Sequence, residues 1–107
     1  MGTRSTINIK TEDGRYKGIY CHWDGYVSHN GRILVNYYTT TEQVEALIAL
    51  GNISSLGETI EACKPYGGES EEAKYTAKYP ESEEYNYVFD NGAWTVNWRP
   101  LSVETAK

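Results

Sequence analysis

The sequence predicts an α+β fold, an antiparallel sheet of about four strands with two or three helices on one face. Two observations predict the strands: apolar and polar residues alternate over residues 6–10 and 16–21, and again over 85–90 and 94–98. A third predicts the helices, because the region between these hairpins carries helix caps and an apolar stripe of helical period.

The first hairpin is predicted by its alternation and by its turn. Ile7 and Ile9 lie on one side of the first strand, and polar residues lie on the other. Asp13-Gly14 then supplies residues that tolerate the positive φ of a tight turn. The alternating segment 16–21 follows as the second strand.

The segment 32–38 fits either a short buried strand or a helix, because periodicity does not separate short apolar runs. We favour a helix, since Asn30 can cap it and its apolar residues would share one face. A second helix is predicted over 39–50. Thr39 or Thr40 can open it, because an acid or amide that completes a capping box stands three residues after each.

The second helix would bury one stripe and end at Gly51, a residue suited to a helix stop. The stripe consists of Val44, Leu47 and Ile48. Residues 57–63 fit one further helical turn, which Pro65 would end.

The segment 66–84 is different in composition, with six glutamates, two lysines and almost no aliphatic residues. We expect either a mobile acidic loop or a marginal surface helix with Tyr75 and Tyr79 on one face.

The second hairpin turns at Asn91-Gly92, the strongest short hairpin signal. Pro100 would end its second strand, which leaves 101–107 as a frayed tail. We find no linker or repeat, so residues 1–107 are interpreted as a single domain.

Composition restricts the partners. The net charge of −5 argues against direct binding to nucleic acid, which needs a basic face, and favours a basic protein partner. No apolar run approaches the ~20 residues of a membrane helix, so we expect no membrane contact. Cys21 and Cys63 make no disulfide framework, which predicts a cytoplasmic protein with reduced thiols.

The candidate site is the stretch 20–26, where the second strand gives way to a turn. It carries two phenols, an indole, an imidazole, a thiol and a carboxylate. Because strand residues alternate, Cys21 would face the core, and Trp23, Asp24 and Tyr26 would remain as a recognition turn.

Metal binding and catalysis are the weaker interpretations of this stretch. The ligand-type residues Cys21, His22, His29 and Cys63 match no paired zinc spacing, so we expect no metal and no cofactor. A Cys–His enzyme has the right residue types, but no nucleophile elbow or glycine-lined oxyanion hole accompanies them. We therefore expect no catalysis.

Two binding functions remain. Tyr20 and Trp23 could stack on a nucleotide while an arginine, such as Arg4, binds its phosphate. Alternatively, exposed aromatic rings beside carboxylates have the composition of a protein-binding hot spot. A secondary acidic face would steer a basic partner toward it. The predicted binding residues are Tyr20, His22, Trp23, Asp24, Tyr26 and Arg4, and the acidic face comprises Glu69, Glu71, Glu72, Glu81, Glu83 and Glu84.

From Ser5 to about Gly57 the sequence resembles a family of small proteins of bacteriophages and prophages. The C-terminal half is only loosely similar, through residues 85–88 and 92–94. The matching residues are Ser5-Thr6-Ile7, Asp13-Gly14, Ile19-Tyr20-Cys21-His22-Trp23-Asp24-Gly25-Tyr26, Asn30-Gly31, Leu34, Tyr38, Leu47-Ile48-Ala49-Leu50-Gly51 and Ile53-Ser54-Ser55-Leu56-Gly57.

The resemblance implies a viral origin and a place in the host bacterial cytosol. By analogy with small acidic phage accessory proteins, it implies an anti-defence (anti-CRISPR-like) factor that binds a host defence protein or protein–nucleic-acid complex, such as a CRISPR effector. This non-catalytic inhibitor is our leading hypothesis. Sequestration of a nucleotide-derived immune signal is the alternative, and a small Cys/His enzyme is the third. Aromatic edge strands also make a homodimer possible.

Overall fold

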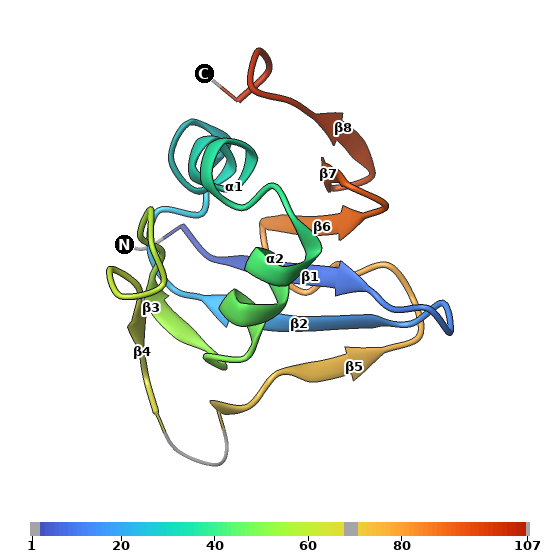
Figure 1. Cartoon of the computed structure of the whole chain (residues 1–107), viewed down its shortest axis with the longest axis horizontal. Coiled ribbons are helices and arrows are strands. Elements are labelled where there is room, and N and C mark those ends of the chain that lie inside the picture. The colour runs from blue at the N-terminus through green and yellow to red at the C-terminus, as the bar shows by residue number, and fades with distance from the viewer. Residues whose placement is uncertain (1–2, 68–70, 107) are drawn as a thin grey trace.

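The computed structural model describes residues 3–67 and 71–106, and within them one mixed eight-stranded sheet lies behind two short helices (Figure 1). Neighbouring strands run in the order β4-β3-β2-β1-β6-β7-β8, and β5 also pairs with β2. The strands are β1 (Ser5–Lys10), β2 (Tyr16–Cys21), β3 (Ile53–Ser55), β4 (Lys64–Pro65), β5 (Lys74–Thr76), β6 (Tyr85–Asp90), β7 (Ala93–Val96) and β8 (Arg99–Leu101).

The predicted antiparallel sheet of about four strands is wrong. The two hairpins join through β1 and β6, which are parallel neighbours in register from Ser5↔Tyr85 to Ile9↔Phe89. The alternation in each strand was visible in the sequence, but the direction of pairing between hairpins depends on the path of the chain between them. Four further strands have only two or three residues each, too few to show a period of two.

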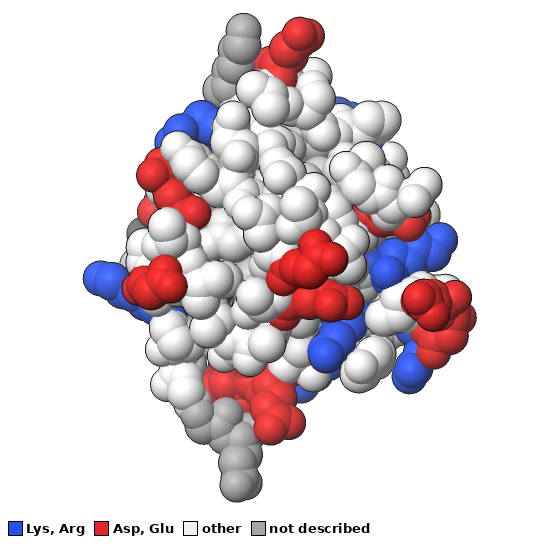
Figure 2. All heavy atoms as spheres, in the orientation of Figure 1, with Lys and Arg blue, Asp and Glu red and all other residues white. Residues whose placement is uncertain are grey.

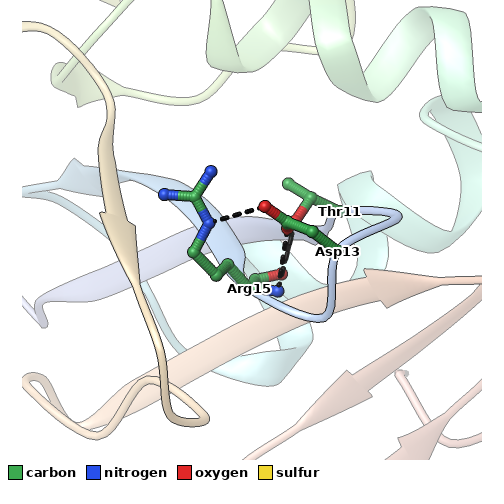
Figure 3. Close-up of polar contacts among 3 residues, drawn as sticks. All are labelled: Thr11, Asp13 and Arg15. Carbon is green, nitrogen blue, oxygen red and sulfur yellow. Dashed lines mark hydrogen bonds and ion pairs between the residues drawn. The ribbon is translucent and has the colours of Figure 1, made fainter.

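The first hairpin is confirmed, with β1 and β2 antiparallel from Ser5↔Cys21 to Lys10↔Tyr16. Its turn is held by polar contacts among Thr11, Asp13 and Arg15 (Figure 3). The Thr11 hydroxyl and the Arg15 Nε both donate to the Asp13 carboxylate, the latter at 2.8 Å. The bond from Thr11, followed by those from Arg15, lowers the pKa of Asp13.

Both principal helices are confirmed, in shorter form. Helix α1 spans Arg32–Tyr37 and helix α2 spans Thr41–Ile48. Thr40 caps α2 through a capping box with Gln43, as one of the two predicted pairings requires. The predicted Asn30 cap is wrong, because a π-helical turn, η1 (Val27–Gly31), precedes α1 and the Asn30 side chain is turned inward. Residues 57–63 form turns, so the third helix is also absent from the described chain.

The C-terminal hairpin is confirmed, but it is part of a three-stranded meander. Asn91 and Gly92 both have positive φ, as a two-residue turn between β6 and β7 requires. A second such turn follows at Asn97-Trp98, with φ values of 46° and 74°, and leads into β8. The predicted tail therefore begins with a strand residue, Leu101, that is buried, and Ala106 is buried as well.

The core lies between the sheet and the helices. Ile7, Ile9, Ile19 and Cys21 project from the central strands toward this side. They meet the buried stripe of α2 that the sequence predicted, Val44, Leu47 and Ile48, together with residues of α1. Figure 2 shows acidic side chains spread over this helix-bearing side, while several basic ones gather at the edge where the β1–β2 turn lies in Figure 1.

Where the structure describes it, the acidic segment does not form the surface helix offered as one alternative; it contains one short strand followed by loop. Residues 74–76 form β5, which pairs with β2. Residues 77–84, here called the covering segment, then pass behind the sheet on the side away from the helices (Figure 1). Tyr79 and Pro80 in this segment are buried, while Tyr75 is exposed, so the two tyrosines do not share one face.

Candidate functional site

The side of the sheet away from the helices, here called the polar face, carries a hydrogen-bonded network. The Asn8 Nδ2 donates to Thr6 Oγ1 at 2.9 Å, and Thr6 Oγ1 donates to Asn86 Oδ1 at 2.8 Å. The Asn86 Nδ2 in turn reaches Asn97 Oδ1 at 3.2 Å. The network thus links β1, β6 and the β7–β8 turn, and such buried networks fix geometry when their members are paired.

The same asparagines fasten the end of the covering segment. The Asn86 Nδ2 donates to the carbonyl of Glu83 at 2.8 Å, and the Asn97 Nδ2 donates to that of Glu84 at 2.8 Å. Two backbone carbonyls of an acidic, polar stretch are therefore satisfied by side chains from the sheet.

Tyr79 anchors the middle of the covering segment. Its hydroxyl lies 2.7 Å from Thr95 Oγ1 and accepts a hydrogen bond from the backbone N–H of Trp98 at 3.1 Å. Its ring stacks on the indole of Trp98, with centroids 3.9 Å apart, and meets the ring of Tyr16 edge-on at 5.7 Å. This ring buries apolar area in a segment otherwise rich in charge, which favours the packing of the segment against the sheet.

A cavity of about 400 Å³ lies between the polar face and the covering segment. Thr6, Asn8, Gly18 and Tyr20 of the two central strands contribute to its lining from the sheet. Ile19 of β2 and Asn52 add to this lining. The rest comes from β5 and the covering segment: Lys74, Thr76, Lys78, Tyr79, Pro80, Glu81, Ser82 and Glu83.

Of the predicted site residues, Tyr20, His22 and Trp23 form one cluster. The Tyr20 hydroxyl and His22 Nδ1 are 2.7 Å apart, and the His22 ring meets the Trp23 indole edge-on at 4.7 Å. Burial raises the pKa of the Tyr20 phenol, the nearby Arg4 guanidinium opposes that shift, and the Glu83 carboxylate adds to it. Arg4 itself is exposed.

The aromatic turn, residues 23–26, is held in a strained and crowded backbone. Asp24 has a φ of 57°, a region that residues with a side chain enter at a cost of about 1 kcal/mol or more. Gly25 donates to the carbonyl of Thr3 at 2.7 Å, and a Cβ at Gly25 would lie only 2.7 Å from that same oxygen. The Trp23 N–H donates to the Ser54 carbonyl at 3.0 Å.

Asn30 connects the aromatic turn to the core through its side-chain amide. Its fully buried Nδ2 lies within 3.3 to 3.4 Å of Ser5 Oγ, Cys21 Sγ and the carbonyl of Trp23. The backbone N–H of Asn30 donates to the Asp24 carbonyl at 3.2 Å. The turn is therefore fixed at several points, while the Trp23 and Tyr26 side chains remain 43% and 38% exposed.

Asp24, Tyr26 and His29 form a second group on the turn. The Tyr26 hydroxyl donates weakly to Asp24 Oδ1 at 3.4 Å, and the Tyr26 ring meets the His29 ring at 6.0 Å. The structure thus divides the predicted binding residues into two neighbouring groups, one around His22 and one around Tyr26.

Of the two Cys–His pairings considered for catalysis, Cys21 does not meet His22, and Asn30 lies between Cys21 and His29, with Nδ2 at 3.4 Å from Cys21 Sγ and Oδ1 at 3.0 Å from His29 Nδ1. Cys21 is buried on the helix side of the sheet, while His22 bonds to Tyr20 on the opposite side. Burial raises the pKa of the Cys21 thiol, although Asn30, Trp23 and Ser5 oppose the shift, and this favours the unreactive thiol form. Within residues 3–67 and 71–106, no three His, Cys, Asp or Glu side chains gather as metal ligands would.

The predicted acidic face is divided in the structure. Glu71 accepts from Asn52 at both its backbone carbonyl, 2.6 Å, and its side chain, 3.0 Å, and lines a different hollow together with Glu72. Glu81 and Glu83 line the cavity over the polar face. Glu84 lies with them beside Trp98, and Glu69 lies outside the described residues.

The residues that sequence reasoning missed are Thr6, Asn8, Asn86 and Tyr79. The first three alternate with the apolar residues of their strands and were therefore assigned to a solvent-facing side. One signal was available: asparagine is unfavourable within strands, and three asparagines, Asn8, Asn86 and Asn97, stand in predicted strands.

The chain matches no protein-family model, no curated protein sequence and no solved structure, so its site is interpreted from geometry alone. In the part of the chain that the structure describes, no helix has the length and apolar character to span a bilayer.

Proposed function

We propose that this chain is a phage-encoded accessory protein of the host cytoplasm that inhibits a host defence component by non-catalytic binding. The aromatic turn is its contact surface. The observation that supports this most directly is a strained backbone, fixed by the core, that presents Trp23 and Tyr26 to solvent.

Such an arrangement lowers the stability of the fold without an evident structural benefit. A left-handed Asp24 adds strain, and two large rings are left partly in water where burial would stabilise the fold. Rigid exposed Trp and Tyr side chains are, however, the residues that dominate binding energy at protein interfaces. They also lose little conformational entropy on binding when the backbone beneath them is already fixed.

The charges suggest a basic partner. Asp24 stands between the two exposed rings, and the whole chain carries a net charge of −5. A surface that normally grips nucleic acid, as in a CRISPR effector, has the complementary sign. Carboxylates at the rim would mainly raise the association rate and make it depend on salt.

The test is phage plating on bacteria that carry one defined defence system, with and without the protein. We expect the wild-type chain to restore plaque formation against a sensitive system and to copurify with one of its components. Trp23→Ala and Tyr26→Ala should each lose both properties while keeping the wild-type unfolding curve.

Tyr37→Ala is the matched control, because Tyr37 is an aromatic residue of α1 with the same 43% exposure as Trp23. It should leave protection unchanged. If Trp23→Ala and Tyr37→Ala behaved alike, the aromatic turn would not be the contact surface.

A second function is favoured by one observation. Tyr20, which the nucleotide hypothesis named, lines the cavity on the polar face. The chain would then act by sequestering a nucleotide-derived immune signal, without touching a defence protein. Trp23, the other ring of that hypothesis, is not among the residues that line this cavity.

A further inference from the structure

The cavity on the polar face is a formed space, because its walls are fixed without a ligand. Its floor is the centre of the sheet, and the covering segment is fastened by Tyr79, Asn86 and Asn97. Its volume of about 400 Å³ lies within the range of roughly 300–1,000 Å³ typical of small-molecule sites.

Asn8 supplies an acceptor that the protein leaves open. Its two amide hydrogens are used, because Nδ2 donates to Thr6 Oγ1 and to the carbonyl of Tyr87, each at 2.9 Å. Its Oδ1 lies over Gly18 in the lining of the cavity, and no donor among the described residues reaches it. Asn8 as a residue is only 5% exposed, but the described residues include no buried side-chain oxygen without a partner, so Oδ1 keeps some access to the cavity, where a ligand N–H or O–H can donate to it.

The lining carries charged residues of both signs, which lie on opposite sides of Tyr79 in the sequence. Lys74 and Lys78 stand before the Tyr79 anchor, and Glu81 and Glu83 stand after it. The ion pairs of the described chain engage neither lysine. The cavity therefore offers cations for an anionic group and further acceptors, beside Asn8, for ligand donors.

Ring surfaces complete the lining. Tyr79 has one face covered by Trp98, whereas Tyr20 is only partly buried and lines the cavity. A planar heterocycle is the ligand body that such a wall accepts best.

We propose that this cavity binds a nucleoside phosphate, a small molecule that combines a planar ring bearing N–H donors with an anionic group. Asn8 Oδ1 accepts from the ring, and Lys74 and Lys78 hold the phosphate. The inference deepens the second function proposed above and is independent of the first, because Trp23 and Tyr26 do not line the cavity.

The test is calorimetric titration of the full-length protein with adenosine, guanosine, cytidine and uridine monophosphates, with their nucleosides, and with inorganic phosphate. We expect at least one monophosphate to bind with a Kd below about 1 mM. The double variant Lys74→Ala/Lys78→Ala should weaken that binding by about tenfold or more, while affecting the matching nucleoside little. Both lysines are exposed, so the fold should survive.

Lys64→Ala is the matched control, since Lys64 is an exposed lysine outside the cavity, on β4. It should bind as the wild type does, and so should Trp23→Ala. The proposal is overturned if no monophosphate binds below about 1 mM, or if the Lys74/Lys78 variant and the Lys64 variant bind alike. Neither result tests the protein-binding function, which the phage plating of Trp23→Ala tests separately.

Discussion

The side-chain amide of Asn8 occupies the space directly above Gly18, its cross-strand partner. A Cβ built on Gly18 would lie 1.7 Å from Asn8 Oδ1. The glycine thereby lets a polar side chain lie flat on the sheet, where it bonds to Thr6 and to the Tyr87 carbonyl. A glycine that weakens a strand in isolation is here what makes room for the polar network.

Gly18→Ala is therefore expected to destabilise the protein by about 1–3 kcal/mol, because Asn8 must leave its position and give up its bonds. Urea unfolding followed by tryptophan fluorescence would measure the loss. The control is the same substitution in an Asn8→Ala background, where the side chain that a Cβ on Gly18 would meet is removed. Gly18→Ala should cost much less there, and an equal loss in both backgrounds would contradict the crowding of Asn8.

Tyr79→Phe is expected to cost about 1–3 kcal/mol, because the Thr95 hydroxyl and the Trp98 N–H both lose their partner. The covering segment should also become more accessible, which limited proteolysis between residues 77 and 84 would detect. Tyr75→Phe serves as the comparison, since Tyr75 is 50% exposed. If that variant were cut as fast as Tyr79→Phe, the hydroxyl of Tyr79 would not be the anchor.

Thr40→Ala is expected to lower the free energy of unfolding by about 0.5–2 kcal/mol, because it removes the side chain that accepts from the Gln43 N–H. Helix α2 supplies much of the core on the helix side, so its fraying should show in thermal unfolding. The adjacent Thr41→Ala keeps the capping box and should change stability much less. A larger loss at Thr41 would place the helix start elsewhere.

Stability is expected to fall in alkaline solution, above about pH 10. Burial raises the pKa of the Tyr87 phenol, with smaller effects from neighbouring groups, and its hydroxyl donates to the Gly25 carbonyl at 2.6 Å. The folded state then holds its proton more tightly than the unfolded state, so this stabilisation is complete below about pH 10 and is lost as pH rises further.

Tyr87→Phe tests this linkage. It should reduce stability at pH 7 by about 1 kcal/mol or more, because the Gly25 carbonyl loses its donor, and it should flatten the pH dependence between about pH 10 and 12. Residual slope is expected, since burial also raises the pKa of Tyr38. An unchanged slope in Tyr87→Phe would mean that Tyr87 does not titrate with unfolding.

The candidate site was predictable only where it depended on residues close together in the sequence. The exposed Trp23 and Tyr26 and the inward Cys21 follow from strand alternation and the turn. The cavity does not, because it joins Asn8 and Tyr20 to Lys78 and Glu83, and only the folded path of the covering segment brings these together. A charged segment with almost no aliphatic residues has a composition typical of disorder, and no local pattern shows that Tyr79, Asn86 and Asn97 hold it against the sheet.

The sequence by itself determined the elements whose signals are local. The Asp13-Gly14 and Asn91-Gly92 turns, the apolar stripe of α2 and its Thr40 cap depend on residues within a few positions of one another. Only the tertiary structure decided that β1 pairs parallel with β6, that four very short strands extend the sheet, and that the covering segment closes the polar face. The pairing of β1 with β6 depends on contacts across about 80 residues, such as the bond from Thr6 to Asn86, and β5 reaches β2 across about 60. The other short strands pair over smaller separations, but they are too short to show a period of two in the sequence.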